Sequence, residues 1–179
     1  MKVSDFAYDL PEALIAQHPV EPRDASRLLV VDPVTGALEH RHFCDLIDYL
    51  RPGDILVAND TRVIPARLFA RKPTGGRVEL LLLDRLSDES WEVLVGGRNV
   101  EPGLTLTLLD HAGEPTAVSA SVVATGAEAL RVLRFNAPVE EWVELLGYAP
   151  LPPYIHEPLN DPERYQTIYA RPAGSAAAP

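Results

Sequence analysis

The first candidates for chemistry are four consecutive polar residues, Asn59, Asp60, Thr61 and Arg62. Together they offer an amide, a carboxylate, a hydroxyl and a guanidinium within one short stretch. A carboxylate that is partly withdrawn from water can have its pKa tuned for proton transfer, so Asp60 is the first candidate for a general base. Asn59, Thr61 and Arg62 are candidates for polar contacts with a substrate.

These residues follow a stretch that is predicted to be a buried strand. Residues 54–58 have the length and the branched aliphatic content of such a strand, and Pro52 and Gly53 favour a turn before it. Ligands of α/β sheets usually bind where strands end. A structural role is the alternative, because Asp60 could instead pair with Arg62 or cap a turn.

Three further residues have side chains suited to binding or proton transfer. Arg67, like Arg62, can bind a phosphate or a carboxylate through two parallel hydrogen bonds. If both arginines lie on one strand, their odd-numbered separation places them on opposite faces. Tyr154 and His156 follow a rigid Pro-Pro pair; Tyr154 is a candidate for stacking on a base and His156 for proton transfer. An isolated histidine is usually structural, and that alternative stays open.

The charge distribution bears on a nucleic-acid partner. A formal net charge of -10 opposes binding to RNA by the molecule as a whole. Positive charge is nevertheless concentrated locally, and a basic stripe on an acidic protein can dock RNA with an affinity that falls with salt. The stripe consists of Arg62, Arg67, Arg71, Lys72 and Arg77.

The composition is that of a globular protein, with 46% hydrophobic and 23% charged residues. A single cysteine, Cys44, excludes an intrachain disulfide and a multi-cysteine zinc site, and no histidine lies near a cluster of metal ligands, so no metal is expected. No apolar run reaches the ~20 residues of a membrane span, and the acidic N-terminus is unlike a signal peptide. A cytoplasmic protein without a membrane partner is expected.

The periodicity of apolar residues predicts mixed α and β structure around a β domain. A helix at 10–16, a hairpin of strands at 27–32 and 37–41 and a helix at 43–50 precede the strand at 54–58. Six short strands without intervening helices then favour a small barrel or sandwich. They are expected at 63–71, 77–83, 91–95, 104–109, 116–125 and 129–136.

After the strands, helical spacing returns at 138–146, where Trp142 is expected in the core. The proline-rich residues 150–153 predict an extended connector. Asp161 is expected to cap a helix whose first position is Pro162.

Several motifs together resemble one known family. The chain is similar to the N-terminal part of the S-adenosylmethionine:tRNA ribosyltransferase-isomerase family of queuosine biosynthesis. The resemblance implies a mixed α/β domain into which a closed, six-stranded antiparallel β-barrel is inserted, with boundaries at 1–62, 63–147 and 148–179. The matching motifs follow the family's order and include I-A-Q-H-P (15–19), V-A-N-D-T-R-V-I-P-A-R-L (57–68), W-E-V-L-V (91–95), G-Y-A-P-L-P-P-Y-I (147–155) and E-R-Y-Q-T-I-Y-A-R (163–171).

The resemblance also implies a reaction and its substrates. The ribosyl moiety of S-adenosylmethionine would be transferred to 7-aminomethyl-7-deazaguanine in tRNA and isomerised, giving epoxyqueuosine without a metal. Asp60 would then act as a base or bind a ribose hydroxyl, and Arg164 and Tyr165, in the family's R-Y-Q-T-x-Y segment, would contact substrate. The side chain of Tyr165 fits packing equally well.

Two departures from the family pattern limit this interpretation. The family's basic Pro-Gly-Lys-Arg-like turn is replaced by residues 96–100, which keep Arg98 but lack the lysine. The chain also ends at Pro179, where the family continues into a Thr-Ala-Gly-Leu-His-Phe-type motif and a second half, so an inactive fragment is expected. The alternatives are a non-catalytic barrel that binds RNA or protein, and the inactive remnant of a disrupted gene.

Overall fold

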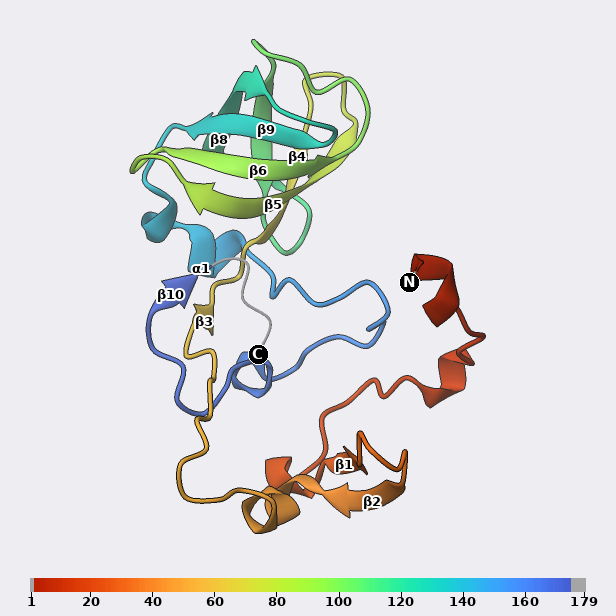
Figure 1. Cartoon of the computed structure of the whole chain (residues 1–179). Coiled ribbons are helices and arrows are strands. Elements are labelled where there is room, and N and C mark those ends of the chain that lie inside the picture. Colours follow the sequence, from red (N-terminus) through yellow and green to blue (C-terminus); the bar gives the residue numbers. More distant parts are fainter. Residues whose placement is uncertain (1, 175–179) are drawn as a thin grey trace. The chain divides into compact units, whose positions relative to one another are not determined.

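The structure is a computed structural model that describes residues 2–174 of the chain. The chain forms two compact units (Figure 1). The first runs to Ala58 and includes Pro152–Pro158. The second comprises Asn59–Leu151 and resumes at Leu159.

The second unit contains a closed antiparallel barrel with the strand order β4-β5-β6-β9-β8-β7 (Figure 1). The predicted six-stranded antiparallel barrel is therefore confirmed. Closure gives every barrel strand two neighbours, so none of them is an open edge strand. The strands are β4 (Arg67–Arg71), β5 (Arg77–Arg85), β6 (Ser90–Gly96), β7 (Thr105–Leu109), β8 (Pro115–Thr125) and β9 (Leu130–Phe135).

The barrel interior is filled by alternate residues of its strands. In β4, for example, Leu68 and Ala70 are fully buried while their neighbours are partly exposed. With this period of two residues, one side chain lies in the core and the next lies on the surface. The other strands contribute Val78, Leu80, Leu82, Trp91, Val93, Val95, Leu106, Leu108, Ala120, Val122, Leu133 and Phe135.

One end of the barrel is covered by the segment predicted as a helix at 138–146. Its apolar stripe is buried as expected, and the ring of Trp142 lies 5.0 Å from that of Phe135. The helix is not continuous, however, but consists of η5 (Val139–Glu141) and α1 (Val143–Leu146). The break falls at Trp142, whose φ is -137° and whose indole NH donates to Ala137 O at 3.3 Å. Anchoring of the indole thus outweighs helical continuity.

The strand predicted at 63–71 is divided in two. β3 (Arg62–Val63) pairs in parallel with β10 (Ala173–Gly174), whereas β4 belongs to the barrel. Between them Pro65 has no NH to donate to a ladder, and Ala66 N turns back to Ile64 O at 2.7 Å. Arg62 and Arg67 therefore lie on separate strands and not on opposite faces of one.

The first unit has little regular structure beyond one hairpin. β1 (Arg27–Val31) and β2 (Leu38–His42) confirm the predicted antiparallel pair. The helices expected at 10–16 and 43–50 are short 3-10 segments, η2 (Glu12–Leu14) and η4 (Phe43–Asp48). The other 3-10 segments are η1 (Val3–Phe6), η3 (Arg23–Ala25) and, in the second unit, η6 (Pro162–Tyr165).

The prediction of a buried strand at 54–58 is wrong. These residues have no regular structure, and Ile55 and Val57 are 89% and 88% exposed. Apolar residues form a buried strand only where neighbouring strands accept their backbone hydrogen bonds, and no described strand lies beside them. None of the described residues up to 58 is buried. Among residues 2–174, no helix has the length and hydropathy needed to span a membrane.

Candidate functional site

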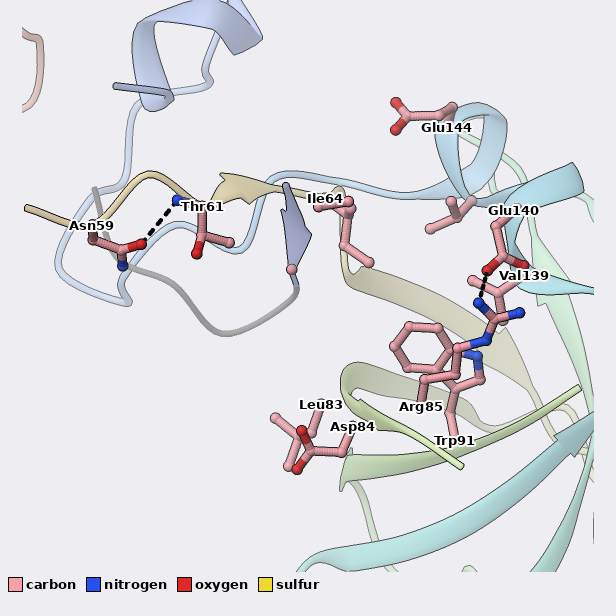
Figure 2. Close-up of a pocket in the computed structure, with 13 residues that line it drawn as sticks. Asn59, Thr61, Ile64, Leu83, Asp84, Arg85, Trp91, Val139, Glu140 and Glu144 are labelled. Carbon is pink, nitrogen blue, oxygen red and sulfur yellow. Dashed lines mark hydrogen bonds and ion pairs between the residues drawn. The ribbon is translucent and has the colours of Figure 1, made fainter. Parts of the chain in front are cut away.

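A cavity of about 680 Å³ lies in the second unit, at the end of the barrel covered by η5 and α1 (Figure 2). Residues from five parts of this unit meet there: the stretch after Ala58, the end of β5, the start of β6, the covering segment and β10. The lining residues are Asn59, Thr61, Ile64, Leu83, Asp84, Arg85, Trp91, Val139, Glu140, Val143, Glu144, Ala173 and Gly174.

A β-bulge aims the end of β5 at this cavity. Leu82 pairs with Val93 and Arg85 with Trp91, so β5 carries one residue more than β6 over this stretch. A bulge bends its strand and turns side chains out of the regular alternation. Leu83, Asp84 and Arg85 consequently all line the cavity.

The cavity wall is acidic, with an aromatic ring beside it. Arg85 forms ion pairs with Glu140 at 2.9 Å and with Asp88 at 2.7 Å, so its charge is already balanced (Figure 2 shows the Glu140 pair). Asp84 and Glu144 add two further carboxylates to the lining. Trp91 is 93% buried, and its indole NH has no hydrogen-bond partner among the described residues. Because the lining holds three carboxylates and an arginine that is already ion-paired, a cationic ligand suits this cavity better than an anion.

Asn59 and Thr61 are the predicted site residues that line the cavity. The Asn59 carboxamide oxygen accepts the Thr61 backbone NH at 2.9 Å, which closes a tight turn and holds the Asn59 side chain (Figure 2). β10 approaches Thr61 closely, since a Cβ added to Gly174 would lie 2.6 Å from Thr61 Cγ2. Asn59 and Thr61 therefore line the cavity although the strand predicted before them is absent, and their contact with a substrate stays a prediction.

Asp60 is not among the residues that line the cavity. Its backbone carbonyl accepts Arg171 N at 2.9 Å, but its exposed side chain does not line the cavity and has no hydrogen bond or ion pair with any described residue. The structural alternatives for Asp60 thus lose their support, because Arg62 pairs with Glu163 and Asn59 closes the turn. Its role as a base stays a prediction.

The two candidate arginines are both engaged within the second unit. Arg62 forms an ion pair with Glu163, and this hydrogen-bonded carboxylate raises the pKa of the guanidinium. Arg67 donates to Leu151 O at 2.9 Å and lies 3.0 Å from Glu79 Oε1. A substrate anion would have to compete with Glu163 or Glu79 for either cation.

The R-Y-Q-T segment contributes packing and backbone contacts. Asp161 caps η6 by accepting Glu163 N at 3.0 Å, with Pro162 at its first position, as the sequence predicted. Within η6, Tyr165 donates its hydroxyl to Pro150 O at 3.3 Å and Arg164 is partly buried. Neither side chain lines the cavity.

Tyr154 and His156 belong to the first unit. Gln17 holds this segment, donating to Tyr154 O at 3.0 Å and accepting His156 N at 2.7 Å. The imidazole of His156 lies 3.7 Å from Glu12 Oε1, and the side chain of Tyr154 is exposed. Their predicted roles in stacking and proton transfer are untested by these contacts.

The charged part of the cavity wall was not anticipated from the sequence. Asp84 and Arg85 lie far from Glu140 and Glu144 in the chain, and neither pair belongs to a local motif. The usable signal was the W-E-V-L-V motif, which begins at Trp91 opposite Arg85. Among the described residues, no three His, Cys, Asp or Glu side chains converge as metal ligands do.

Comparison with known proteins decides the family. The model of a family described as "Queuosine biosynthesis protein" matches residues 3–179. The chain belongs to this family.

This chain is similar over its whole length to proteins named S-adenosylmethionine:tRNA ribosyltransferase-isomerase. Those of Symbiobacterium thermophilum, Moorella thermoacetica and Staphylococcus aureus are 54%, 51% and 48% identical over 183, 181 and 181 residues. The chain spans about half the length of these curated relatives, 52% in each case. A crystal structure of the S-adenosylmethionine tRNA ribosyltransferase from Thermotoga maritima is 45% identical, and the match covers 73% of this chain and 44% of that chain with a TM-score of 0.35.

Proposed function

We propose that this chain is part of a cytoplasmic enzyme that modifies tRNA. The enzyme transfers the ribosyl moiety of S-adenosylmethionine to 7-aminomethyl-7-deazaguanine in tRNA and isomerises it, giving epoxyqueuosine. The observation that carries the proposal is the family match over residues 3–179, together with the similarity of the whole chain to about half of each relative named S-adenosylmethionine:tRNA ribosyltransferase-isomerase.

The lining of the cavity supports this assignment by its charge. S-Adenosylmethionine carries a sulfonium cation next to its ribose, and the aminomethyl group of the deazaguanine is an ammonium ion at neutral pH. Asp84, Glu140 and Glu144 face the cavity, with Arg85 neutralised by its own ion pairs. Carboxylates near a cation lower its electrostatic free energy, so the acidic wall favours either substrate group over a free phosphate.

The roles of individual residues follow from where they lie. Asn59 and Thr61 would contact the substrate directly from the cavity wall, and Asp60 would act as the base or bind a ribose hydroxyl. Arg62 and Arg67 would bind an anionic group after leaving their carboxylate partners. The remaining predicted contacts, from Tyr154, His156, Arg164 and Tyr165, belong to the same proposal, as do the domain boundaries at 62/63 and 147/148.

The chain is proposed to supply only part of the catalytic site. It spans about half the length of the relatives, and the exposed carboxylate of Asp60 lacks the desolvation that would tune a general base. The isolated chain should therefore release no adenine from S-adenosylmethionine.

A chimera tests the function. Residues 1–179 replace the matching part of the Symbiobacterium thermophilum relative, and the product is incubated with S-adenosylmethionine and tRNA that carries the aminomethyl-deazaguanine. Release of adenine and formation of epoxyqueuosine are expected, with the relative itself as the positive control. A folded chimera that binds tRNA without releasing adenine would contradict the proposal and favour a non-catalytic binding module.

A further inference from the structure

Cationic side chains gather at the end of the barrel where β4 ends and β5 begins. Arg71 and Arg77 are directly opposite each other in the β4–β5 ladder. The Lys72 ammonium donates to Arg98 O in the loop between β6 and β7, and Arg71 donates to Gly113 O at 3.0 Å in the loop between β7 and β8. Four residues, Arg71, Lys72, Arg77 and Arg98, form this cationic end of the barrel.

Among residues 2–174, no ion pair balances the charges of the cationic end. None of these four side chains has a carboxylate within 4.0 Å among residues 2–174. Three acidic side chains of neighbouring elements are engaged elsewhere: Glu79 with Arg67, Glu101 with Arg131, and Asp110 with the backbone of its own loop. Glu114 and Glu128, in the loops before β8 and β9, form no ion pair with these four cations within the described residues.

This arrangement costs stability in the free protein. Like charges directly opposite on neighbouring strands repel each other, and the Arg71–Arg77 pair is of this kind. In a chain of net charge -10, an unbalanced cluster of four cations is the place where an anionic partner gains most.

An aromatic row holds one of these cations in position. The Arg77 guanidinium lies 3.9 Å from the centre of the Phe69 ring. Phe69 meets Tyr148 edge to face at 5.4 Å, and Tyr148 in turn lies 4.6 Å from His111. Because Arg77 covers a face of Phe69, the row serves to orient the guanidinium, and a planar, oriented guanidinium suits a phosphate.

The length of β5 separates the cationic end from the cavity. The strand begins with Arg77 at the cationic end and finishes with Arg85 in the cavity wall. Eight steps of about 3.3 Å put the two ends roughly 26 Å apart. A free nucleotide is too small to reach both ends, whereas a folded RNA carries phosphates over that distance.

We propose that the cationic end docks the sugar-phosphate backbone of tRNA at a distance from the cavity. This inference rests on the proposed function, which makes tRNA the polyanion concerned. The contact fixes the position of the RNA without reading its sequence, as phosphate contacts do.

The test is the binding of an unmodified tRNA transcript to the full chain, measured by fluorescence anisotropy over a series of salt concentrations. Arg77→Gln removes one cation from the cationic end. Its matched control is Arg134→Gln. Arg134 is exposed, has no ion pair with any described residue and lies on β9, three strands from β4 in either direction around the barrel. Circular dichroism and thermal unfolding show whether each variant is folded.

Arg77→Gln should reduce the slope of log K against log salt by about one and weaken binding about tenfold at 0.1 M salt, because one fewer counterion is released. Lys72→Gln combined with Arg77→Gln should weaken binding further, while Arg134→Gln leaves it unchanged. Equal losses at Arg77 and Arg134, no loss at Arg77, or no binding by the wild-type chain would overturn the proposal. Displacement of tRNA by polyglutamate at equal charge concentration would also overturn it and assign the surface to an acidic protein.

Adenine release by the chimera separates this inference from the proposed function. If the chimera turns over but Arg77→Gln binds tRNA normally, the docking surface is wrong and the function stands. If Arg77→Gln weakens binding but the chimera releases no adenine, the docking surface stands and the function fails.

Discussion

Neighbouring residues in the Asn59–Arg62 stretch have different surroundings, and the sequence did not distinguish them. The position after an apolar run singled out all four residues, and Asn59 and Thr61 do line the cavity. The carboxylates of Asp84, Glu140 and Glu144 could not be found in this way, because a bulge in β5 and the docking of η5 and α1 bring them together. The sequence shows which chemical group a residue carries, but only the tertiary structure shows which residues lie beside it.

Gln166 is the residue on which the backbone of β3 most depends. It is 93% buried, and its amide both donates to Val63 O and accepts Val63 N, each at 2.8 Å. Gln166→Leu leaves both buried backbone groups of Val63 unpaired, so the free energy of unfolding should fall by about 2 kcal/mol or more in urea denaturation.

The matched control for Gln166 is Gln17, which holds Tyr154 O and His156 N through the same two amide atoms at a more exposed position. Water replaces those hydrogen bonds after Gln17→Leu, so this substitution should lower the free energy of unfolding by less than Gln166→Leu does. Equal losses of unfolding free energy in the two variants would show that burial of the amide does not determine the loss.

At the scale of elements, the sequence predicted strands better than it predicted helices. Alternation of apolar residues is local information, and five of the six barrel strands lie within two residues of their expected bounds. The apolar run at 54–58 has equally suitable residues but no described partner strand, so composition alone was insufficient. Pro65 divided the remaining strand, a signal that was present in the sequence.

The close approach of α1 to the turn between β3 and β4 can be tested at Gly147. A Cβ added there would lie 2.0 Å from Pro65 O and 2.6 Å from Val143 O, so backbone would have to move. Gly147→Ala should lower the free energy of unfolding by roughly 1–3 kcal/mol or more. Gly76→Ala is the control, because its nearest neighbour is Lys72 Cδ at 3.9 Å. Similar stability of the two variants would refute this contact.

At the scale of the whole molecule, buried side chains are confined to residues from 63 onward. Stability should therefore be uneven, because a two-stranded hairpin is marginal without a core. Hydrogen exchange monitored by mass spectrometry should find slow exchange in β4–β9 and fast exchange in residues 2–58. Protection of β1 and β2 equal to that of β5 and β6 would show that the first unit is stabilised by contacts other than those described.

The central claim is that the Asn59–Arg62 stretch belongs to the reaction site of a tRNA-modifying enzyme. The most direct measurement is the rate of adenine release by the chimera that carries Asp60→Asn, compared with the unmodified chimera. Because the Asp60 side chain has no partner among the described residues, the substitution should leave stability unchanged. Loss of a general base should slow release by at least about 100-fold. Release at a near-normal rate would contradict the claim.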